Sequence, residues 1–267
     1  MSWLDALPAQ PAVSVRFRQR FLLIGEVLGL LEPFLNGLHA EQGRLRVGTS
    51  PPWDIDLEAP GGFTYRLRRD GLRVAFSYDN VARDRARLGA RSPTSLAMIE
   101  PKEVIPFSEL LRATIASVDD LLEALAAREA MVDRFGLEAT IPMSRAQAPP
   151  GVGRFLRELG WLPGYEPVRA SCQILSRVAQ RAGSDDRVHY NLQSSEDGDD
   201  LELLLDFQRH LEPPIRLRHP ATGKDLARFI EEAVAHFENF GSGAEAGLQG
   251  QVQRGAFAAE LAPRPGA

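Results

Sequence analysis

The chain has 267 residues, a formal net charge of −5 at pH 7 and a hydrophobic content of 44%. These values are ordinary for a folded globular protein, and the net negative charge argues against a protein whose main task is to wrap nucleic acid. A chain of this length can bury a sizeable core as one large domain or as two closely packed halves. The single cysteine, Cys172, excludes an internal disulfide framework and a cysteine-based zinc site.

The first residues lack a basic segment followed by an apolar run, so we expect no secretory signal. No window reaches ~18 uninterrupted apolar residues, the approximate length needed to cross a bilayer. We therefore expect a cytoplasmic protein without membrane insertion. Many Ala, Gly, Pro and Arg residues with few Lys suggest a bacterial genome rich in G and C.

Alternating polarity predicts several antiparallel strands in the first half of the chain. The expected strands are residues 12–21, 44–47, 53–58 and 63–79, with a short irregular helix over 24–38. Asp70-Gly71 is a favoured turn for a hairpin within 63–79, because both residues can adopt positive φ. That hairpin would bury Phe63, Tyr65 and Leu67 with Leu72, Val74, Phe76 and Tyr78. Residues 81–95 are polar and are expected to form an exposed connection, and the apolar stripe of 107–128 predicts the longest helix.

The second half repeats this plan. A strand is expected over 131–143, a short helix over 152–160, three strands over 167–180, 187–193 and 201–210, and a helix over 225–240. Thr222, followed by Asp225, resembles a capping-box start for that last helix. We predict an α+β fold of two similar strand–helix–antiparallel-sheet–helix units packed together, the N-terminal unit spanning 1–130 and the C-terminal unit spanning 131–240.

Residues 241–267 are rich in Gly and Ala, with isolated apolar side chains. Such a segment cannot bury enough surface to offset the entropy of ordering it, so it is predicted to be a flexible C-terminal tail. The alternative is a tail that folds on a partner through Phe257 and Leu261.

Two histidines and a cluster of carboxylates fall within residues 187–210. If the apolar side chains of both strands share one face, one allowed register pairs Leu192 with Leu203 and leaves 194–200 as the connecting loop. This register places His189 opposite Asp206 on the polar face, with Cβ atoms ~5 Å apart. An imidazole oriented by a carboxylate can perform acid–base chemistry. The structural alternative is a cross-strand pair worth only ~0.2–1 kcal/mol, and we favour it because no nucleophile is identified beside His189.

Arginines alternate along the outer faces of two predicted strands: Arg16, Arg18 and Arg20 on the first, Arg66 and Arg68 on another. In one sheet, their forked donors could bind phosphates or carboxylates. Asp54, Asp56 and Glu58 project from the same face of the intervening strand and could instead neutralise this charge. The face also lacks the interleaved aromatic residues of a nucleic-acid stacking platform. An anion-binding surface and self-paired structural charge both stay open, with the second favoured.

The sequence motifs by which several enzyme classes are recognised are absent. There is no phosphate-binding G-x-x-x-x-G-K-[ST] and no G-x-S-x-G, and Leu156 stands where residues 151–160 would need the third glycine of a dinucleotide loop. The acidic loop at 194–200 lacks the spacing of a calcium site, and the histidines form no metal-binding motif. We expect no cofactor and no metal.

The segments at 132–141, 201–210 and 229–240 resemble, in order, elements of a sporadically distributed, uncharacterised prokaryotic protein family. Arg134, Phe135, Gly136 and Leu137 match the Arg–hydrophobic–Gly–Leu strand that follows a long helix in that family. The residues at 138–140 depart from its Arg-Tyr-Asn. The resemblance spans most of residues 12–240 and implies an α+β layout, without implying any catalytic residue.

These observations favour a non-enzymatic binding or assembly protein, which engages a protein partner or a second copy of itself through its sheet faces or its tail. One alternative is an anion-, nucleotide- or RNA-binding module built on Arg16, Arg18, Arg66 and Arg68, although the net charge does not favour nucleic acid. The other alternative is a hydrolase or transferase centred on His189 and Asp206.

Overall fold

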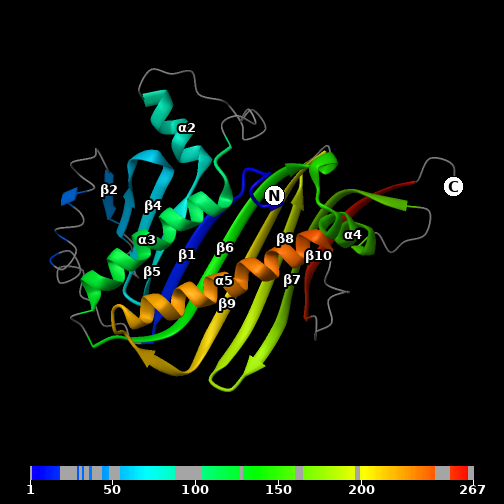
Figure 1. The fold of residues 1–267 in the computed structure, drawn as a ribbon. Helices are drawn as coiled ribbons and strands as arrows, with labels where there is room; N and C mark the ends of the chain where they lie inside the picture. The colour runs from blue at the N-terminus through cyan, green and yellow to red at the C-terminus, as the bar shows by residue number, and fades with distance from the viewer. Residues whose placement is uncertain are drawn as a thin grey trace.

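The computed structural model describes residues 2–18, 29, 32, 36–37, 44–47, 55–87, 104–126, 129–159, 165–195, 199–243 and 253–263. Its strands are β1 (Gln10–Phe17), β2 (Arg44–Val47), β3 (Ile55–Glu58), β4 (Phe63–Arg68), β5 (Gly71–Phe76), β6 (Met131–Ser144), β7 (Tyr165–Arg181), β8 (Ser184–Ser194), β9 (Asp200–Arg216) and β10 (Gln253–Pro263). They form one ten-stranded sheet in the order β10-β7-β8-β9-β6-β1-β5-β4-β3-β2 (Figure 1). Every neighbouring pair is antiparallel.

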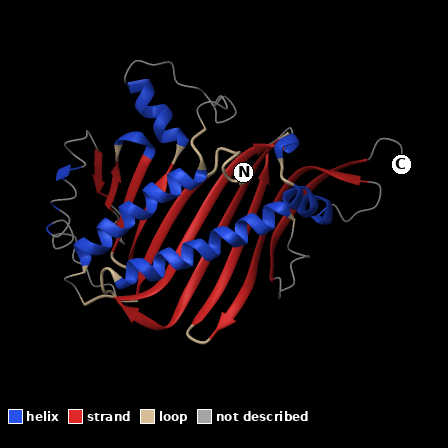
Figure 2. Ribbon diagram, viewed as in Figure 1, coloured by secondary structure: helices blue, strands red, loops and turns tan. Residues whose placement is uncertain are grey.

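The α-helices for which bounds are described are α2 (Tyr78–Arg87), α3 (Phe107–Leu125), α4 (Pro150–Leu159) and α5 (Ala221–Ser242), and short 3-10 helices lie at Pro60–Gly62 and Arg145–Gln147. The long helices α3 and α5 lie across one face of the sheet (Figure 2). Their apolar stripes bury Val118 and Leu122 of α3 and Phe229 and Phe237 of α5 against that face, in one continuous core. The predominantly antiparallel sheet with helices agrees with the predicted α+β class.

We call the sheet face opposite α3 and α5 the open face. Because side chains alternate along a strand, every second residue of β1, β6 and β9 points to it. On β1, Val13 and Val15 are buried in the core, while Ser14 is half-buried and Arg16 is exposed on the open face. The same alternation runs through β6 and β9. The polar half of each strand pattern is therefore gathered on one surface.

The strand order is similar on the two sides of the central β1–β6 pair. Outward from β1 the order is β5, β4, β3, and outward from β6 it is β9, β8, β7. In each half, the strand that precedes the long helix pairs with the first strand of that half. All these strands belong to a single sheet, and the division at residue 130 and the internal duplication stay predictions.

In the β4–β5 hairpin the observed register pairs Leu67 with Leu72, whereas the predicted turn at Asp70-Gly71 would pair Leu67 with Val74. The turn lies one residue earlier than predicted. Arg69 and Asp70 form the turn, and Gly71 is the first residue of β5. Gly71 is not among the glycines with positive φ. A Cβ at Gly71 would lie 2.7 Å from the carbonyl oxygen of Val15 on β1. Close approach of two strands, and not the turn conformation, is what requires glycine here.

Replacing Gly71 with alanine is expected to lower the free energy of unfolding by about 1–3 kcal/mol, because a backbone carbonyl must move to admit the new methyl group. Urea unfolding measures this change. Gly37→Ala is the matched control, since a Cβ at Gly37 meets nothing within 4 Å, and its expected effect is within about 0.5–1 kcal/mol. Equal stability of the two variants would contradict the close-approach explanation.

The predicted strand end and connection after Phe76 are wrong, because residues 78–87 form helix α2. The amides of Asn80 and Val81 donate to the carbonyl oxygen of Ser77, which starts the helix. Tyr78 is buried by an edge-to-face contact with Phe76, their ring centroids 4.9 Å apart. Tyr78, which continued the alternating strand pattern in the sequence, is therefore the first residue of a helix. The rest of the predicted connection, 88–95, lies outside the described residues, as does most of the predicted helix over 24–38.

Helix α5 begins earlier and runs longer than predicted. It spans 22 residues and follows Pro220, with no side-chain cap, whereas α3 spans 19. The Thr222 hydroxyl accepts a hydrogen bond from the Arg218 amide at 2.9 Å, so it closes the preceding turn and does not act as the predicted cap.

The flexible-tail prediction is not confirmed. Helix α5 extends to Ser242, and residues 253–263 form the edge strand β10, which pairs with β7. In this pairing Phe257 lies opposite Cys172 and Leu261 opposite Pro167. An edge segment can be ordered by backbone hydrogen bonds to an existing sheet. The low hydrophobicity of the segment gives no indication of those bonds. Residues 244–252 and 264–267 lie outside the described part.

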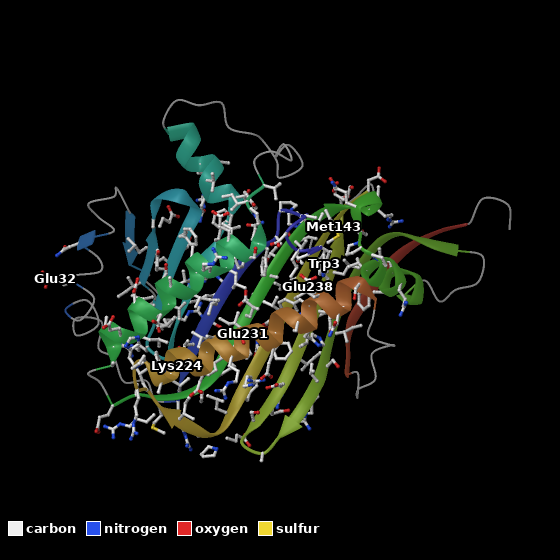
Figure 3. All side chains as sticks on the ribbon, in the orientation of Figure 1. Trp3, Glu32, Met143, Lys224, Glu231 and Glu238 are labelled. Atoms are coloured by element: carbon white, nitrogen blue, oxygen red, sulfur yellow. The ribbon has the colours of Figure 1, made fainter. Side chains whose placement is uncertain are left out.

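The N-terminal segment packs against the C-terminal part of α5. The indole Nε1 of Trp3 donates to the carbonyl oxygen of Phe237 at 3.2 Å, and the Ser2 hydroxyl bonds the Glu238 carboxylate. Trp3 and Glu238 lie at this junction in Figure 3. Among the helices described, none is both long and apolar enough to span a membrane.

Candidate functional site

A groove of about 610 Å³ lies on the open face where β4, β5, β1 and β6 meet. Five arginines and two carboxylates dominate its described lining. The lining residues are Ser14, Val15, Arg16, Arg66, Arg68, Asp70, Gly71, Leu72, Arg73, Arg134 and Glu138. The groove therefore gathers arginine side chains on the face for which the sequence suggested an anion-binding surface.

Strand register brings the arginines together from distant parts of the sequence. Arg16 of β1 lies opposite Arg134 of β6, and Arg66 of β4 lies opposite Arg73 of β5. Neighbouring strands are ~4.8 Å apart, so each pair places two guanidinium-bearing side chains side by side. Like charges directly opposite on a sheet are unfavourable unless something compensates them.

The floor of the groove is built from small residues. Ser14 of β1 lies opposite Gly136 on one side and Arg73 on the other. A Cβ at Gly136 would lie 2.5 Å from the Ser14 Oγ, so the glycine keeps the space above Ser14 empty. Gly71 similarly adds no side chain opposite Arg16. Among the described residues, the Ser14 hydroxyl has no hydrogen-bond partner.

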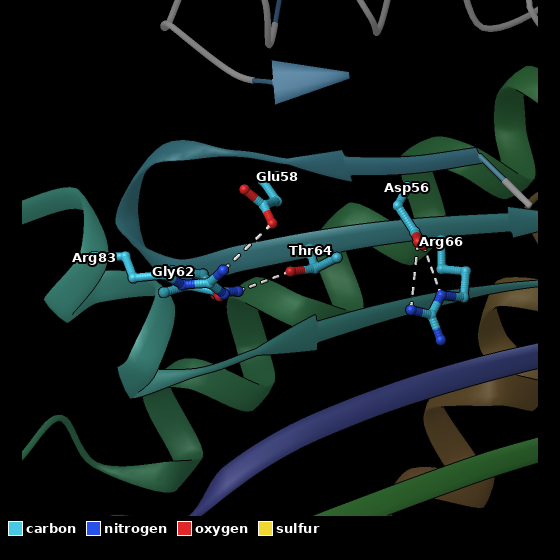
Figure 4. A network of polar contacts seen from close by, with 7 residues as sticks. Asp56, Glu58, Gly62, Thr64, Arg66 and Arg83 are labelled. Atoms are coloured by element: carbon cyan, nitrogen blue, oxygen red, sulfur yellow. Dashed lines mark hydrogen bonds and ion pairs between the residues drawn. The ribbon is translucent and has the colours of Figure 1, made fainter. Parts of the chain in front are cut away.

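Two of the arginines are held by carboxylates. Arg73 pairs side-on with Glu138, through Nε to Oε1 at 3.3 Å and through a terminal nitrogen to Oε2 at 2.7 Å. Arg66 pairs with Asp56 of β3 at 2.6 and 3.4 Å in the same way (Figure 4). Such two-point contacts fix the plane of a guanidinium, and that of Arg73 retains further N–H groups as donors.

The Arg16–Arg134 pair is less neutralised. The nearest carboxylate oxygen to Arg16 belongs to Asp70 at 4.0 Å, and both side chains are well exposed. Arg134 donates to the neutral side-chain oxygen of Gln208 at 2.9 Å. The pKa of Arg134 is lowered from its ordinary value, first by burial and then by the charge of Arg16. The repulsion between Arg16 and Arg134 is opposed by the charges of Asp206, Asp133 and Asp70, each of which acts on Arg134 less strongly than Arg16 does.

The sequence prediction identified three of these five arginines. Arg16, Arg66 and Arg68 line the groove. Arg18 lies just beyond β1, where its amide donates to Met131 O at 2.8 Å, and it is not in the lining. The prediction that carboxylates of the intervening strand neutralise the arginines holds in part, since Asp56 pairs with Arg66. Glu58 instead lies 3.8 Å from Arg83 of α2, outside the groove (Figure 4). Arg20 and Asp54 lie outside the described residues.

Sequence reasoning missed Arg73 and Arg134. The predicted turn at Asp70-Gly71 would pair Arg73 with Arg68, whereas the observed register pairs Arg73 with Arg66. Arg134 could not be assigned, because it reaches the groove only through the pairing of β6 with β1.

The His189–Asp206 pair has the predicted register, with Leu192 opposite Leu203 and His189 opposite Asp206. No hydrogen bond joins the pair within the described structure. Asp206 accepts a hydrogen bond from the Gln208 amide at 2.5 Å and lies opposite Glu138 on its other side. Burial and the Glu138 charge raise the pKa of Asp206 to about 6, while burial lowers the pKa of His189.

No described hydroxyl or thiol completes a catalytic set around His189. Its cross-strand neighbours are Leu175 and Asp206, and the residues two positions away on its own strand are Arg187 and Asn191. Ser176 is buried on the other face, opposite Val188. Neither His189 nor Asp206 is in the lining of the groove. The hydrolase hypothesis gains no support from this geometry.

Asp206→Asn is expected to stabilise the protein at about pH 8 by ~1–3 kcal/mol and to have little effect near pH 4. The pKa of Asp206 is about 6 when folded, against an ordinary 3.8. The folded state therefore binds this proton more tightly, and the resulting stability, present at low pH, is lost as pH rises through 6. Asparagine keeps the acceptor for Gln208 without the buried charge.

Urea unfolding of Asp206→Asn and of the wild type, at about pH 4 and pH 8, measures the difference in the free energy of unfolding. Titration of the histidines affects both proteins equally and cancels in this difference. Glu202→Gln, an exposed carboxylate on the same strand, is the control. An Asp206→Asn effect that does not change between about pH 4 and pH 8 would contradict a raised pKa for Asp206.

Among the described residues, no group of three or more His, Cys, Asp or Glu side chains could hold a metal ion. Comparisons with protein-family models, with curated proteins and with solved structures found no match to this chain. The groove is accordingly interpreted from its own chemistry.

Proposed function

We propose that the protein is a binding protein that takes a phosphate- or carboxylate-bearing ligand into the groove on its open face. The observation that carries the proposal is the Arg16–Arg134 pair, two arginines on directly opposed positions of β1 and β6. Within the described residues, the ion pair of Arg16 with Asp70 is long, at 4.0 Å, and Arg134 donates to the neutral Gln208. An anion between them would replace a repulsive contact with two charge-assisted ones.

The charge balance of the groove supports this proposal. Five arginines line the groove, and they outnumber by two the three described carboxylates that contact them, Asp56, Asp70 and Glu138. The whole chain carries a net charge of −5. A cationic hollow in an acidic protein attracts small anions locally and does not make the molecule a general polyanion binder. The held guanidinium of Arg73 is already oriented and loses little entropy when it binds.

The lining favours binding over catalysis and a small ligand over nucleic acid. Its described residues include no histidine or cysteine that could serve as a general base or thiol nucleophile. They also include no aromatic ring on which a base could stack. The groove volume of about 610 Å³ lies within the range of small-molecule sites.

The remaining sequence hypotheses belong to this proposal as expectations. These expectations are two similar units, a cytoplasmic location, and assembly with a protein partner or a second copy. Contacts of a partner with Phe257 and Leu261 would involve the edge strand β10, since that is where both residues lie.

Isothermal titration of the wild-type protein with pyrophosphate and with citrate tests the proposal. At a salt concentration of about 20 mM we expect measurable binding of at least one anion, and an affinity about tenfold weaker near 200 mM, because salt screens exposed charges. No binding of either anion at low salt would overturn the proposed function.

A further inference from the structure

We propose that the ligand group held in the groove is a phosphoryl group, seated above Ser14 and Gly136 and bound by Arg16, Arg73 and Arg134. This inference rests on the proposed function and narrows its ligand to small phosphate esters. It adds Ser14 and Gly136 to the binding residues.

The sheet register surrounds Ser14 with arginines on three sides. Arg73 lies directly opposite on β5, and Arg16 lies two residues along β1. Arg134 lies diagonally across on β6, because Gly136 is the residue opposite Ser14. Directly opposed Cβ atoms are ~5 Å apart and diagonal positions ~7–8 Å apart, which is within the reach of arginine side chains. The three guanidinium groups can therefore converge on one point above the Ser14 hydroxyl.

Donors from three directions and a hydroxyl suit a tetrahedral oxyanion. A phosphoryl group presents three terminal oxygens that point apart, and each can accept from a different side. A carboxylate presents two oxygens in one plane, and a single guanidinium fork satisfies both. The arrangement around Ser14 therefore favours phosphate over carboxylate.

The seat is kept open and is oriented in advance. A side chain at Gly136 would enter the space above Ser14, where even a Cβ would lie 2.5 Å from the hydroxyl oxygen. Glu138 contacts Nε and one terminal nitrogen of Arg73, which leaves the far edge of that guanidinium as a donor. The Ser14 hydroxyl has no other partner among the described residues and can donate to the ligand.

Calorimetric titrations with ribose 5-phosphate and succinate, two small anions that carry close to two negative charges near pH 7.5, test the inference. We expect ribose 5-phosphate to bind the wild type about tenfold more tightly than succinate. A short single-stranded oligonucleotide provides a third arm, and its affinity should not exceed that of ribose 5-phosphate. Tighter binding of the oligonucleotide would overturn the choice of a small ligand.

Ser14→Ala is expected to weaken ribose 5-phosphate about three- to tenfold, the usual effect of one hydrogen bond, without changing succinate. Ser14→Thr, which retains the hydroxyl, should restore most of the affinity. Arg177→Ala, on β7 of the same sheet, should leave both affinities unchanged. Equal binding of both anions, or an unaffected Ser14→Ala, would overturn the phosphoryl seat and leave the proposed function standing. If neither anion binds, the phosphoryl seat and the proposed function are both overturned.

Discussion

Reversing the charge of Arg134 is expected to reduce the affinity of the groove for an anion about 100-fold, which corresponds to ~2.7 kcal/mol. Arg134→Glu removes one cation from beside the ligand and puts a carboxylate in its place. For the fold, the like-charge pair with Arg16 becomes an opposite-charge pair across β1 and β6, while the attraction of Arg134 to Asp206, Asp133 and Asp70 is replaced by repulsion. These changes oppose each other, so we expect binding to be lost in a variant that still unfolds cooperatively in urea.

Arg177→Glu is the control for Arg134→Glu. Arg177 is on β7, three strands beyond β6 in the sheet order, and it pairs with Asp185 at 2.9 Å. The substitution changes the net charge by the same amount without touching the groove, so it should alter affinity less than about threefold. Equal losses in the two variants would show that net charge, and not the groove, governs binding. Full affinity in Arg134→Glu would contradict the site.

The second large effect is expected at Arg209, on the helix-covered side of the sheet. Arg209 makes a two-point contact with Asp186 at 2.7 and 2.6 Å and a further contact with Glu232 of α5 at 2.8 Å. Asp186 is only 2% exposed. The guanidinium carbon also lies 5.4 Å from the centre of the Phe229 ring. This network joins β8 and β9 to α5.

Arg209→Met is expected to lower the free energy of unfolding by about 3–5 kcal/mol, because it leaves the Asp186 charge buried without its cation. Removing both charges with Arg209→Met and Asp186→Leu together should recover most of that loss. Arg187→Met breaks a pair of Asp185 with an arginine that is 39% exposed, so it should cost less than about 1 kcal/mol. Urea unfolding measures all three. A double variant as unstable as the single one would contradict the explanation.

Local patterns in the sequence predicted the apolar faces of the hairpins. In the hairpin within 187–210, alternation of apolar residues limited the possible registers, because a shift of one residue would expose one whole apolar face. The allowed register that pairs Leu192 with Leu203 is the one observed. The same rule placed His189 opposite Asp206. Local patterns were less reliable at the turn between β4 and β5. Gly71 was assigned to that turn, but glycine is required there because β1 approaches it closely.

The groove depends on information that local patterns do not contain. Arg16 and Arg134 are far apart in the sequence and meet because β1 pairs with β6, a non-local contact that alternation along either strand does not specify. The edge strand β10 was missed for a related reason, since its order comes from pairing with β7 and not from its composition. The sequence therefore predicted which faces carry charge, and the sheet order determined which charges meet.

Crystals soaked with tungstate, a heavy tetrahedral oxyanion, test the central claim most directly, because anomalous scattering locates the anion without reference to any assay. The account predicts an anomalous peak above Ser14, within hydrogen-bonding distance of Arg16, Arg73 and Arg134 and absent from crystals of Arg134→Glu. A groove without a peak, while tungstate binds elsewhere on the protein, would contradict it.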